Sequence, residues 1–104
     1  MEETMIVLTT TGSVDDGRRL ARAFVEEKLA ACVNLVPIHS IYSWQDAIQD
    51  EPECLLVIKT ASLRLHRLEE RLHEIHPYSV PEFVAVRAEH VADAYKGWLL
   101  GCVS

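Results

Sequence analysis

The sequence predicts an α+β protein with the ferredoxin-like, split βαβ order β-α-β-β-α-β and one further helix at the C-terminus. Three observations support this prediction: four runs rich in apolar and β-branched residues, amphipathic segments between them, and no internal linker or low-complexity tract. A length of 104 residues provides for one core, so we expect a single domain over residues 1–104. Right-handed crossovers then place the two connecting helices on one face of the sheet.

The first half of the chain is expected to form a strand, a helix and a long second strand. Thr4–Thr11 contains a short buried run, and Ser13 with Asp16 matches the spacing of a helix-capping box. The stretch Leu29–Trp44 is almost continuously apolar or β-forming, and its sixteen residues reach roughly 50 Å when extended. Because a compact chain of this size is only about 35 Å across, this strand extends beyond its own globule unless Pro37 breaks it.

The third strand and the second helix come next. Asp46–Pro52 reads as a polar turn segment and Glu53–Thr60 as an apolar strand. Ser62 is expected to cap a helix, which ends before Pro77 because proline restrains the preceding residue from helical geometry. The apolar stripe of that helix comprises Leu65, Leu68, Leu72 and Ile75.

The chain is expected to close with a fourth strand and a third helix. Pro81–Arg87 forms the strand, with proline at its first position, where it is tolerated. The helix is weakened by Gly97 and is expected to end near Gly101. Its apolar positions are Val91, Ala94, Tyr95, Trp98, Leu99 and Cys102.

The apolar stretch Leu29–Trp44 also predicts assembly. Long apolar strand edges recruit other chains when they are exposed. We therefore expect another copy of the same protein to cover this strand.

The charge balance limits the classes of partner. Sixteen acidic against ten basic residues give a net charge of −6, and no basic run occurs. Nucleic acid and anionic membranes are therefore disfavoured partners, whereas cations are favoured.

The cysteines and the N-terminus indicate the cytoplasm. Cys32, Cys54 and Cys102 are odd in number and lack C-x-x-C spacing, which favours free thiols in a reducing compartment. The acidic start Met1–Thr4 has no basic region, and the apolar run Met5–Leu8 is too short for a signal peptide or a membrane span.

The densest candidate site is the segment His76–Glu82, between the second helix and the fourth strand. Its two prolines stiffen a loop that presents an imidazole (His76), a phenol (Tyr78) and a carboxylate (Glu82). Imidazole and carboxylate are metal ligands, which makes this a candidate ligand or metal site. The alternative is a structural turn in which Tyr78 packs and Glu82 bonds nearby backbone groups or a neighbouring subunit.

A second candidate lies on the second helix. Its residues are His66, Glu69, Glu70, His73 and His76. His66, Glu70 and His73 share one helical face, and His73 and His76 are three residues apart. Pairs of this kind chelate Zn²⁺ or Cu²⁺ when a third ligand converges. The alternative, a solvated face opposite the leucine stripe, is favoured. Likewise Trp44, Trp98 and Tyr95 can line a ligand pocket but are more often core or interface anchors.

Catalysis has little support. The loop Thr11–Gly17 with Arg18 and Asn34 is similar to the phosphate site of acylphosphatases, but Asp15 and Asp16 would repel a phosphate there. No nucleophile elbow, Walker loop or dinucleotide-binding glycine set occurs.

Taken together, five runs resemble the CutA divalent-cation tolerance family, and with the element order they cover essentially the whole chain. The runs are Leu29–Asn34, Ser40–Trp44, Glu53–Thr60, His76–Glu82 and Tyr95–Trp98. The resemblance implies a homotrimer with strands paired between subunits, attributed to copper and divalent-metal tolerance, with no required cofactor and no catalytic activity. It further implies clefts between subunits that bind metal ions or small ligands. The alternative is a signalling module similar to the PII proteins, which binds a small molecule or a protein and has no direct metal role.

The resemblance also implies the site residues. His76 and Glu82 are the expected metal ligands, and Tyr78, Trp44 and Lys59 are expected to line the ligand cleft. In members with a proposed copper site, a cysteine and a histidine stand where this chain has Thr9 and Ile75. We therefore expect only weak binding of Cu²⁺ or another divalent cation.

Overall fold

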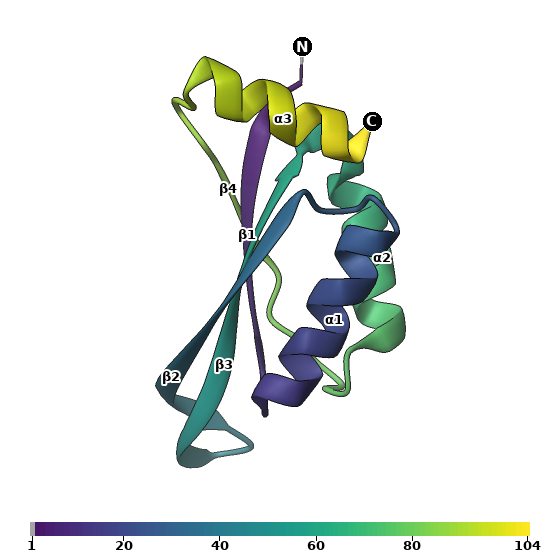
Figure 1. The fold of residues 1–104 in the computed structure, drawn as a ribbon. Helices are drawn as coiled ribbons and strands as arrows, with labels where there is room; N and C mark the ends of the chain where they lie inside the picture. Colours follow the sequence, from purple (N-terminus) through teal and green to yellow (C-terminus); the bar gives the residue numbers. More distant parts are fainter. Residues whose placement is uncertain (1) are drawn as a thin grey trace.

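The structure, a computed structural model, describes residues 2–104 and has the predicted order of elements (Figure 1). The elements are β1 (Thr4–Thr11), α1 (Val14–Glu26), β2 (Cys32–Trp44), β3 (Ala47–Ala61), a short 3-10 helix η1 (Ser62–Arg64), α2 (Leu65–Ile75), β4 (Val84–Arg87) and α3 (Asp93–Val103). The strands form one antiparallel sheet in the order β2-β3-β1-β4. Helices α1 and α2 lie together on one face of this sheet, and α3 lies across its end (Figure 1). The ferredoxin-like α+β fold with an added C-terminal helix is thus confirmed.

Helix α1 begins and packs as its sequence dictates. The Ser13 hydroxyl accepts a 3.1 Å hydrogen bond from the Asp16 backbone N–H, which satisfies one free donor of the first turn. Gly17 then allows the helix to approach the sheet closely. A Cβ atom at this position would lie 3.1 Å from both Cys54 Sγ and Thr11 Oγ1.

Strand β2 is shorter at its start than predicted, and Pro37 does not break it. Lys28 has a φ of 60°, and the N–H of Leu29 bonds back to the Phe24 carbonyl at 2.8 Å. The N–H of Ala30 bonds to the same carbonyl at 3.2 Å. The two hydrogen bonds hold Leu29 and Ala30 against the end of α1, so strand pairing starts only at Cys32. Pro37 continues the strand because β2 lies at the edge of the sheet, where a missing N–H is tolerated.

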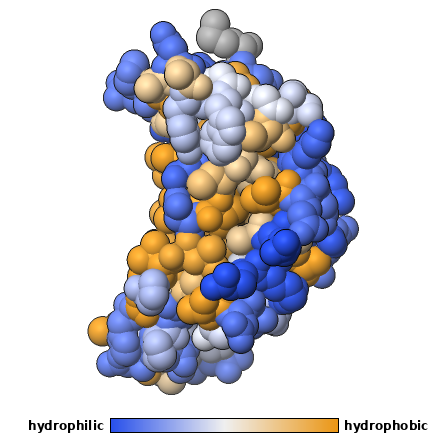
Figure 2. Space-filling model, in the orientation of Figure 1, coloured by the Kyte–Doolittle hydropathy of each residue, from blue (hydrophilic) through white to orange (hydrophobic). Residues whose placement is uncertain are grey.

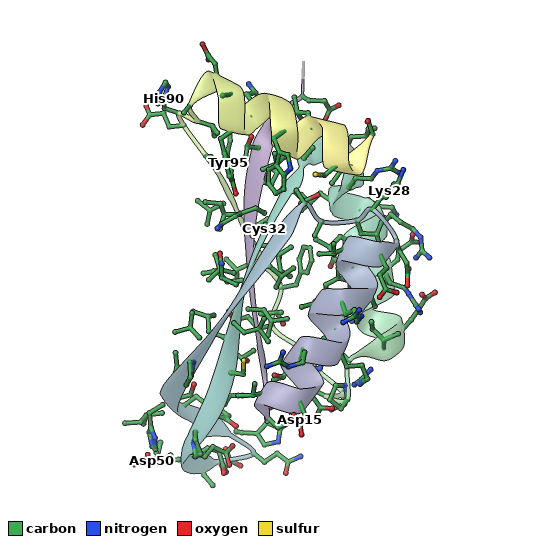
Figure 3. The ribbon with its side chains drawn as sticks, in the orientation of Figure 1. Asp15, Lys28, Cys32, Asp50, His90 and Tyr95 are labelled. Carbon is green, nitrogen blue, oxygen red and sulfur yellow. The ribbon has the colours of Figure 1, made fainter. Side chains whose placement is uncertain are left out.

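The predicted polar turn Asp46–Pro52 is wrong. The turn consists of Gln45 and Asp46 alone, both with positive φ (51° and 63°), the geometry of a two-residue hairpin turn. The polar residues that follow belong to β3, because this part of the hairpin extends beyond the helices and exposes both of its faces to solvent. The molecule is accordingly elongated, measuring 44 × 25 × 21 Å, and Asp50 lies near the projecting end of the hairpin (Figure 3).

The second helix ends as predicted but starts differently. Ser62 does not cap it; its hydroxyl accepts the Glu3 N–H at 3.1 Å and donates to the Glu2 carboxylate at 3.0 Å. Helix α2 follows one 3-10 turn later, without a side-chain cap. His76 ends the helix with a ψ of 135°, the extended geometry that Pro77 requires.

Strand β4 starts three residues later than predicted, and α3 does not end at Gly101. β4 pairs with β1 only from Leu8 to Met5, since the loop after α2 contacts β1 beyond that point. Helix α3 continues to Val103. No atom lies within 4 Å of a Cβ built at Gly97 or Gly101, so both glycines face open space.

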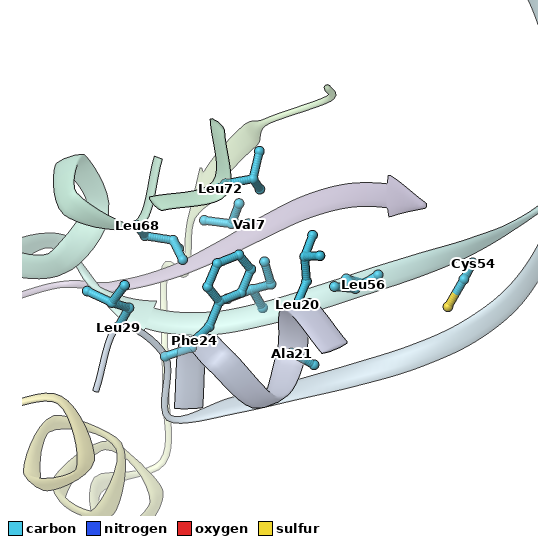
Figure 4. Close-up of a cluster of buried hydrophobic side chains, with 11 residues drawn as sticks. Val7, Leu20, Ala21, Phe24, Leu29, Cys54, Leu56, Leu68 and Leu72 are labelled. Atoms are coloured by element: carbon cyan, nitrogen blue, oxygen red, sulfur yellow. The ribbon is translucent and has the colours of Figure 1, made fainter. Parts of the chain in front are cut away.

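Two apolar clusters hold the fold together. The larger lies between the sheet and helices α1 and α2, where Phe24 and Leu20 point toward the strands (Figure 4). Its buried members are Val7, Leu20, Ala21, Phe24, Leu29, Ala30, Cys54, Leu56, Ile58, Leu68 and Leu72. The smaller cluster packs Leu99 and Val103 of α3 against Ala31 and Ala61. The Arg64 guanidinium donates a 2.6 Å hydrogen bond to the Val103 carbonyl and fixes the end of α3.

The opposite face of the sheet is apolar and open to solvent. Strand alternation places Ile6 and Leu8 of β1 on this face with their β4 partners Val86 and Val84. Val84 and Val86 are 49% and 51% exposed. Figure 2 shows apolar side chains gathered over the strands on the hollowed side of the molecule. We call this surface the open sheet face.

Candidate functional site

A cleft of about 740 Å³ lies between the β2–β3 hairpin and the loop that follows α2. Its lining residues are Thr10, Ile38, Ser40, Ile41, Tyr42, Trp44, Glu51, Glu53, Leu55, Tyr78, Ser79, Val80 and Glu82. Three of the residues expected at a site, Trp44, Tyr78 and Glu82, therefore come together here, although β2 and the loop are far apart in the sequence. The two others, His76 and Lys59, do not line the cleft.

His76 is a buried anchor beneath the cleft. Its side chain is 8% exposed, with Nε2 at 2.8 Å from the Thr10 carbonyl and Nδ1 accepting the Tyr78 backbone N–H at 3.0 Å. Since Nδ1 is an acceptor, the proton is assigned to Nε2 and the imidazole is neutral. Burial lowers the pKa of His76, an effect that the bond to Thr10 partly opposes. Both ring nitrogens are engaged, so His76 could bind a metal only after giving up one of these bonds.

Tyr78 joins the loop to the hairpin. Its hydroxyl donates a 2.9 Å hydrogen bond to the Glu53 carboxylate, and its ring lies 4.8 Å from the His76 ring. A Cβ at Gly12 would lie 3.2 Å from the same hydroxyl, so glycine makes room for the phenol. Burial and the Glu53 hydrogen bond raise the pKa of Tyr78, which keeps the phenol protonated as a donor.

Carboxylates determine the charge of the cleft. Tyr42 donates a 2.6 Å hydrogen bond to Glu51, and this bond raises the pKa of Tyr42 to about 12. Burial, and then the nearby Glu53, raise the pKa of Glu82. The lining includes these three glutamates and no lysine, arginine or histidine. The site therefore has the electrostatics of a cation-binding pocket.

Glu51, Glu53 and Tyr42 also line the cleft, although the sequence does not indicate them as site residues. The sequence predicts a turn at Glu51, whereas the structure places it in β3. Once β3 is extended to Ala47, the period of two puts Glu51, Glu53 and Leu55 on one face. Strand pairing puts Tyr42 on the same face, because Tyr42 pairs with Gln49, two residues before Glu51.

Lys59 lies outside the cleft because it belongs to the other end of the same strand face. Its ammonium group donates to the Asn34 side-chain carbonyl on β2. Lys59 pairs with Cys32 at the start of β2. Cys32 lies toward the end of the sheet that carries α3 and Tyr95, away from the hairpin tip (Figure 3).

No ready metal centre converges in the described chain. Within residues 2–104, no group of three or more His, Cys, Asp or Glu side chains is close enough to hold a metal ion. Thr9 is fully buried on the helix side of β1, and Ile75 packs against the main core. His66 and His73 lie on α2, each near 4 Å from a glutamate one turn away, on a largely exposed surface. This agrees with the solvated-face interpretation.

The arrangement of an acylphosphatase site is absent from residues 2–104. Arg18 is exposed on α1, which covers one face of the sheet. Asn34 pairs with Val57 and belongs to the other face. The two residues therefore cannot converge on one phosphate.

Trp98 and Tyr95 form a separate aromatic pair on α3. Their ring centroids are 5.4 Å apart, and the side chains are 50% and 41% exposed. Neither residue lines the cleft. Within residues 2–104, no helix is long and apolar enough to cross a membrane.

The fold and the cleft define a class: a ferredoxin-like α+β protein with a projecting hairpin and an acidic, aromatic-lined cleft at its base. The family described as "CutA1 divalent ion tolerance protein" matches residues 5–101, so the chain belongs to the CutA1 family, as the sequence predicted.

Proteins of this family from other organisms are similar to the chain over most of its length. The divalent-cation tolerance protein CutA of Thermus thermophilus is 45% identical over 100 residues, which cover 95% of each chain. The solved structure of the divalent cation tolerance protein (Cut A1) from Thermus thermophilus superposes with a TM-score of 0.92 at 43% identity, and the match covers both chains fully. A chloroplastic CutA of Arabidopsis thaliana is 41% identical over 97 residues, but the match spans 92% of this chain and only 53% of the plant protein.

Proposed function

We propose that the chain is a homotrimeric cation-binding protein of divalent-metal tolerance, with its binding sites at clefts between subunits. The observation that carries the proposal is the cleft lined by Glu51, Glu53 and Glu82, directly beside the open sheet face. An acidic lining concentrates cations, and an uncovered apolar face calls for a neighbouring subunit. The names of the relatives, divalent-cation tolerance proteins, support the choice of ligand.

Assembly follows from the two edges and the open face. Strands β2 and β4 are the edges of the sheet, and β2 alone presents thirteen residues. Pairing the β2 edge of one subunit with the β4 edge of the next is a heterologous contact, which forms a closed ring of three when each contact rotates the next subunit by one third of a full turn. Three copies placed in this way would bury Val84, Val86 and Trp98, whose exposure in one subunit is otherwise costly.

Metal binding in this proposal is weak and uses carboxylates. Glu82 and Glu53 are the accessible ligands of the cleft, and His76 becomes a third only after releasing Thr10 or Tyr78. Fewer ligands than the three or four of typical zinc sites give a modest affinity, micromolar or weaker. Among first-row divalent metals, Cu²⁺ binds best to such nitrogen and oxygen donors.

The remaining parts of the proposal concern location and other partners. Cys32, Cys54 and Cys102 are all free thiols, which supports the reducing cytoplasm. A net charge of −6 disfavours nucleic acid and anionic membranes. The proposal requires no resident cofactor and no catalysis. The signalling-module alternative is not favoured, because the family and relatives that match are named for cation tolerance.

The test is a calorimetric Cu²⁺ titration of the wild-type protein, Glu82→Gln and Glu69→Gln at neutral pH. Glu69 lies on the exposed face of α2, so its variant removes the same charge away from the cleft. The proposal predicts micromolar or weaker wild-type binding that is lost in Glu82→Gln and retained in Glu69→Gln. Equal binding by all three proteins would contradict the cleft as the metal site.

A further inference from the structure

The cleft has more volume and more apolar lining than a bare metal ion uses. Its 740 Å³ falls within the range of roughly 300–1,000 Å³ that is typical of small-molecule pockets. Ile38, Leu55 and Val80 line its apolar part, where Ile38 pairs with Glu53 and Leu55 follows two residues along the same strand face. Contact with this apolar part favours a ligand that has a hydrophobic body, because burying apolar surface is the main gain of such a contact.

The carboxylates of the cleft are oriented by their tyrosine partners. Glu51 accepts from Tyr42 and Glu53 accepts from Tyr78, so each carboxylate is held in place by one donor and retains further acceptor positions. Within residues 2–104, no hydrogen bond or ion pair engages Glu82. Burial, and then the nearby Glu53 carboxylate, raise the pKa of Glu82, and a bound positive charge would oppose both effects.

A bare metal ion uses only part of this arrangement, which is why the proposed metal binding is weak. Hard divalent cations need about six to eight converging oxygens, or fewer with bound water, and no group of three converging ligands exists within residues 2–104. An ammonium group needs only two or three acceptors around its N–H donors.

We propose that the cleft binds a small organic cation, a protonated amine on an apolar or aromatic body. The ammonium group lies between Glu53 and Glu82, and the body packs on Ile38 and Leu55. This inference rests on the proposed function, since it names the ligand class of the same cation-binding cleft.

The test compares two probes that differ in charge, 2-phenylethylamine and 2-phenylethanol. Calorimetric titration of the intact protein at neutral pH measures the dissociation constant of each. The amine is expected to bind at least about tenfold more tightly than the neutral alcohol. A factor of ten in the dissociation constant corresponds to one charge-assisted hydrogen bond that the amine makes and the alcohol does not. Equal affinity for the two probes, or no binding of the amine, would overturn the inference.

Three variants locate the binding. Glu82→Gln and Glu53→Gln should each weaken amine binding about tenfold and leave alcohol binding unchanged. Both substitutions are compatible with folding, because Glu82 has no partner within residues 2–104 and a glutamine at 53 still accepts from Tyr78. Glu69→Gln removes an equal charge from exposed α2 and should change neither probe. An equal loss in Glu69→Gln would mean that only the net charge of the protein attracts the amine, and would also overturn the inference.

A Cu²⁺ titration of the same samples separates this inference from the proposed function. If Cu²⁺ binds at Glu82 and the amine does not bind, the proposed function stands and the organic-cation inference fails. If neither ligand binds, both fail. A side chain of a neighbouring subunit that fills the cleft would give this last result.

Discussion

The backbone N–H of Tyr78 donates a 3.0 Å hydrogen bond to Nδ1 of His76, while the opposite ring nitrogen of His76 contacts the Thr10 carbonyl at 2.8 Å. The imidazole thus joins the cleft loop to β1. It also fixes the position of Tyr78, whose hydroxyl holds Glu53. The histidine that the sequence offered as a metal ligand is, within the described chain, the support on which the cleft is built.

This arrangement predicts a pH-dependent stability. His76 has a pKa below its ordinary value of 6.5 in the folded protein, so the unfolded chain binds the proton more readily. The stability that His76 contributes is complete above 6.5 and is lost as pH falls from 6.5 through the lower folded pKa. Urea unfolding between mildly acidic and neutral pH measures this slope, which His76→Gln should reduce and the exposed-site control His66→Gln should retain. An unchanged slope in His76→Gln would contradict the anchor role.

A second prediction concerns the close approach of α1 to the sheet. Gly17→Ala places a methyl group 3.1 Å from Cys54 Sγ and Thr11 Oγ1, and should destabilise the protein by about 1–3 kcal/mol, as overpacking does. Gly97→Ala is the matched control, because its new methyl group meets nothing within 4 Å. That variant should be stabilised by roughly 0.5–1 kcal/mol through better helix propensity. Denaturant unfolding measures both, and equal effects would show that the packing at Gly17 is looser than described.

The cysteines report on assembly. Cys54 is 0% exposed within the subunit core, so its thiol should resist alkylation whatever the oligomeric state. Cys32 is partly exposed in one subunit and, by its pairing with Lys59, belongs to the open sheet face. Its thiol should therefore be slow to react in the assembled protein and faster in a variant that dissociates, such as Val86→Asp. Mass spectrometry after timed iodoacetamide treatment distinguishes the sites, and rapid labelling of native Cys32 would show that this face is uncovered.

The fold was predictable because each main element has a strong local signal. Ser13 and the apolar spacing of α1 specify that helix, and Pro77 ends α2. The hairpin was harder. Gln45 and Asp46 adopt positive φ without a glycine, so the two-residue turn has no marked sequence signal, and the polar residues after it resemble a loop.

The sequence indicates the site residues of the loop after α2, but not those of strand β3. Tyr78 and Glu82 stand out because two prolines hold them in one stiff segment. Glu51 and Glu53 join them only through the register of β2 with β3, which is a non-local relationship. The burial of His76 depends on β1 ending beside α2, which no nearby residue indicates.

The most direct test of the central claim, a trimer that covers the open sheet face, is native mass spectrometry at sub-micromolar concentration. We expect a species near three times 11.8 kDa for the wild-type protein. Val86→Asp, which places a charge on the open sheet face, should shift the population toward smaller species. A control such as Glu69→Gln on the exposed face of α2 should leave the trimer intact. A stable, folded wild-type monomer under these conditions would contradict the account.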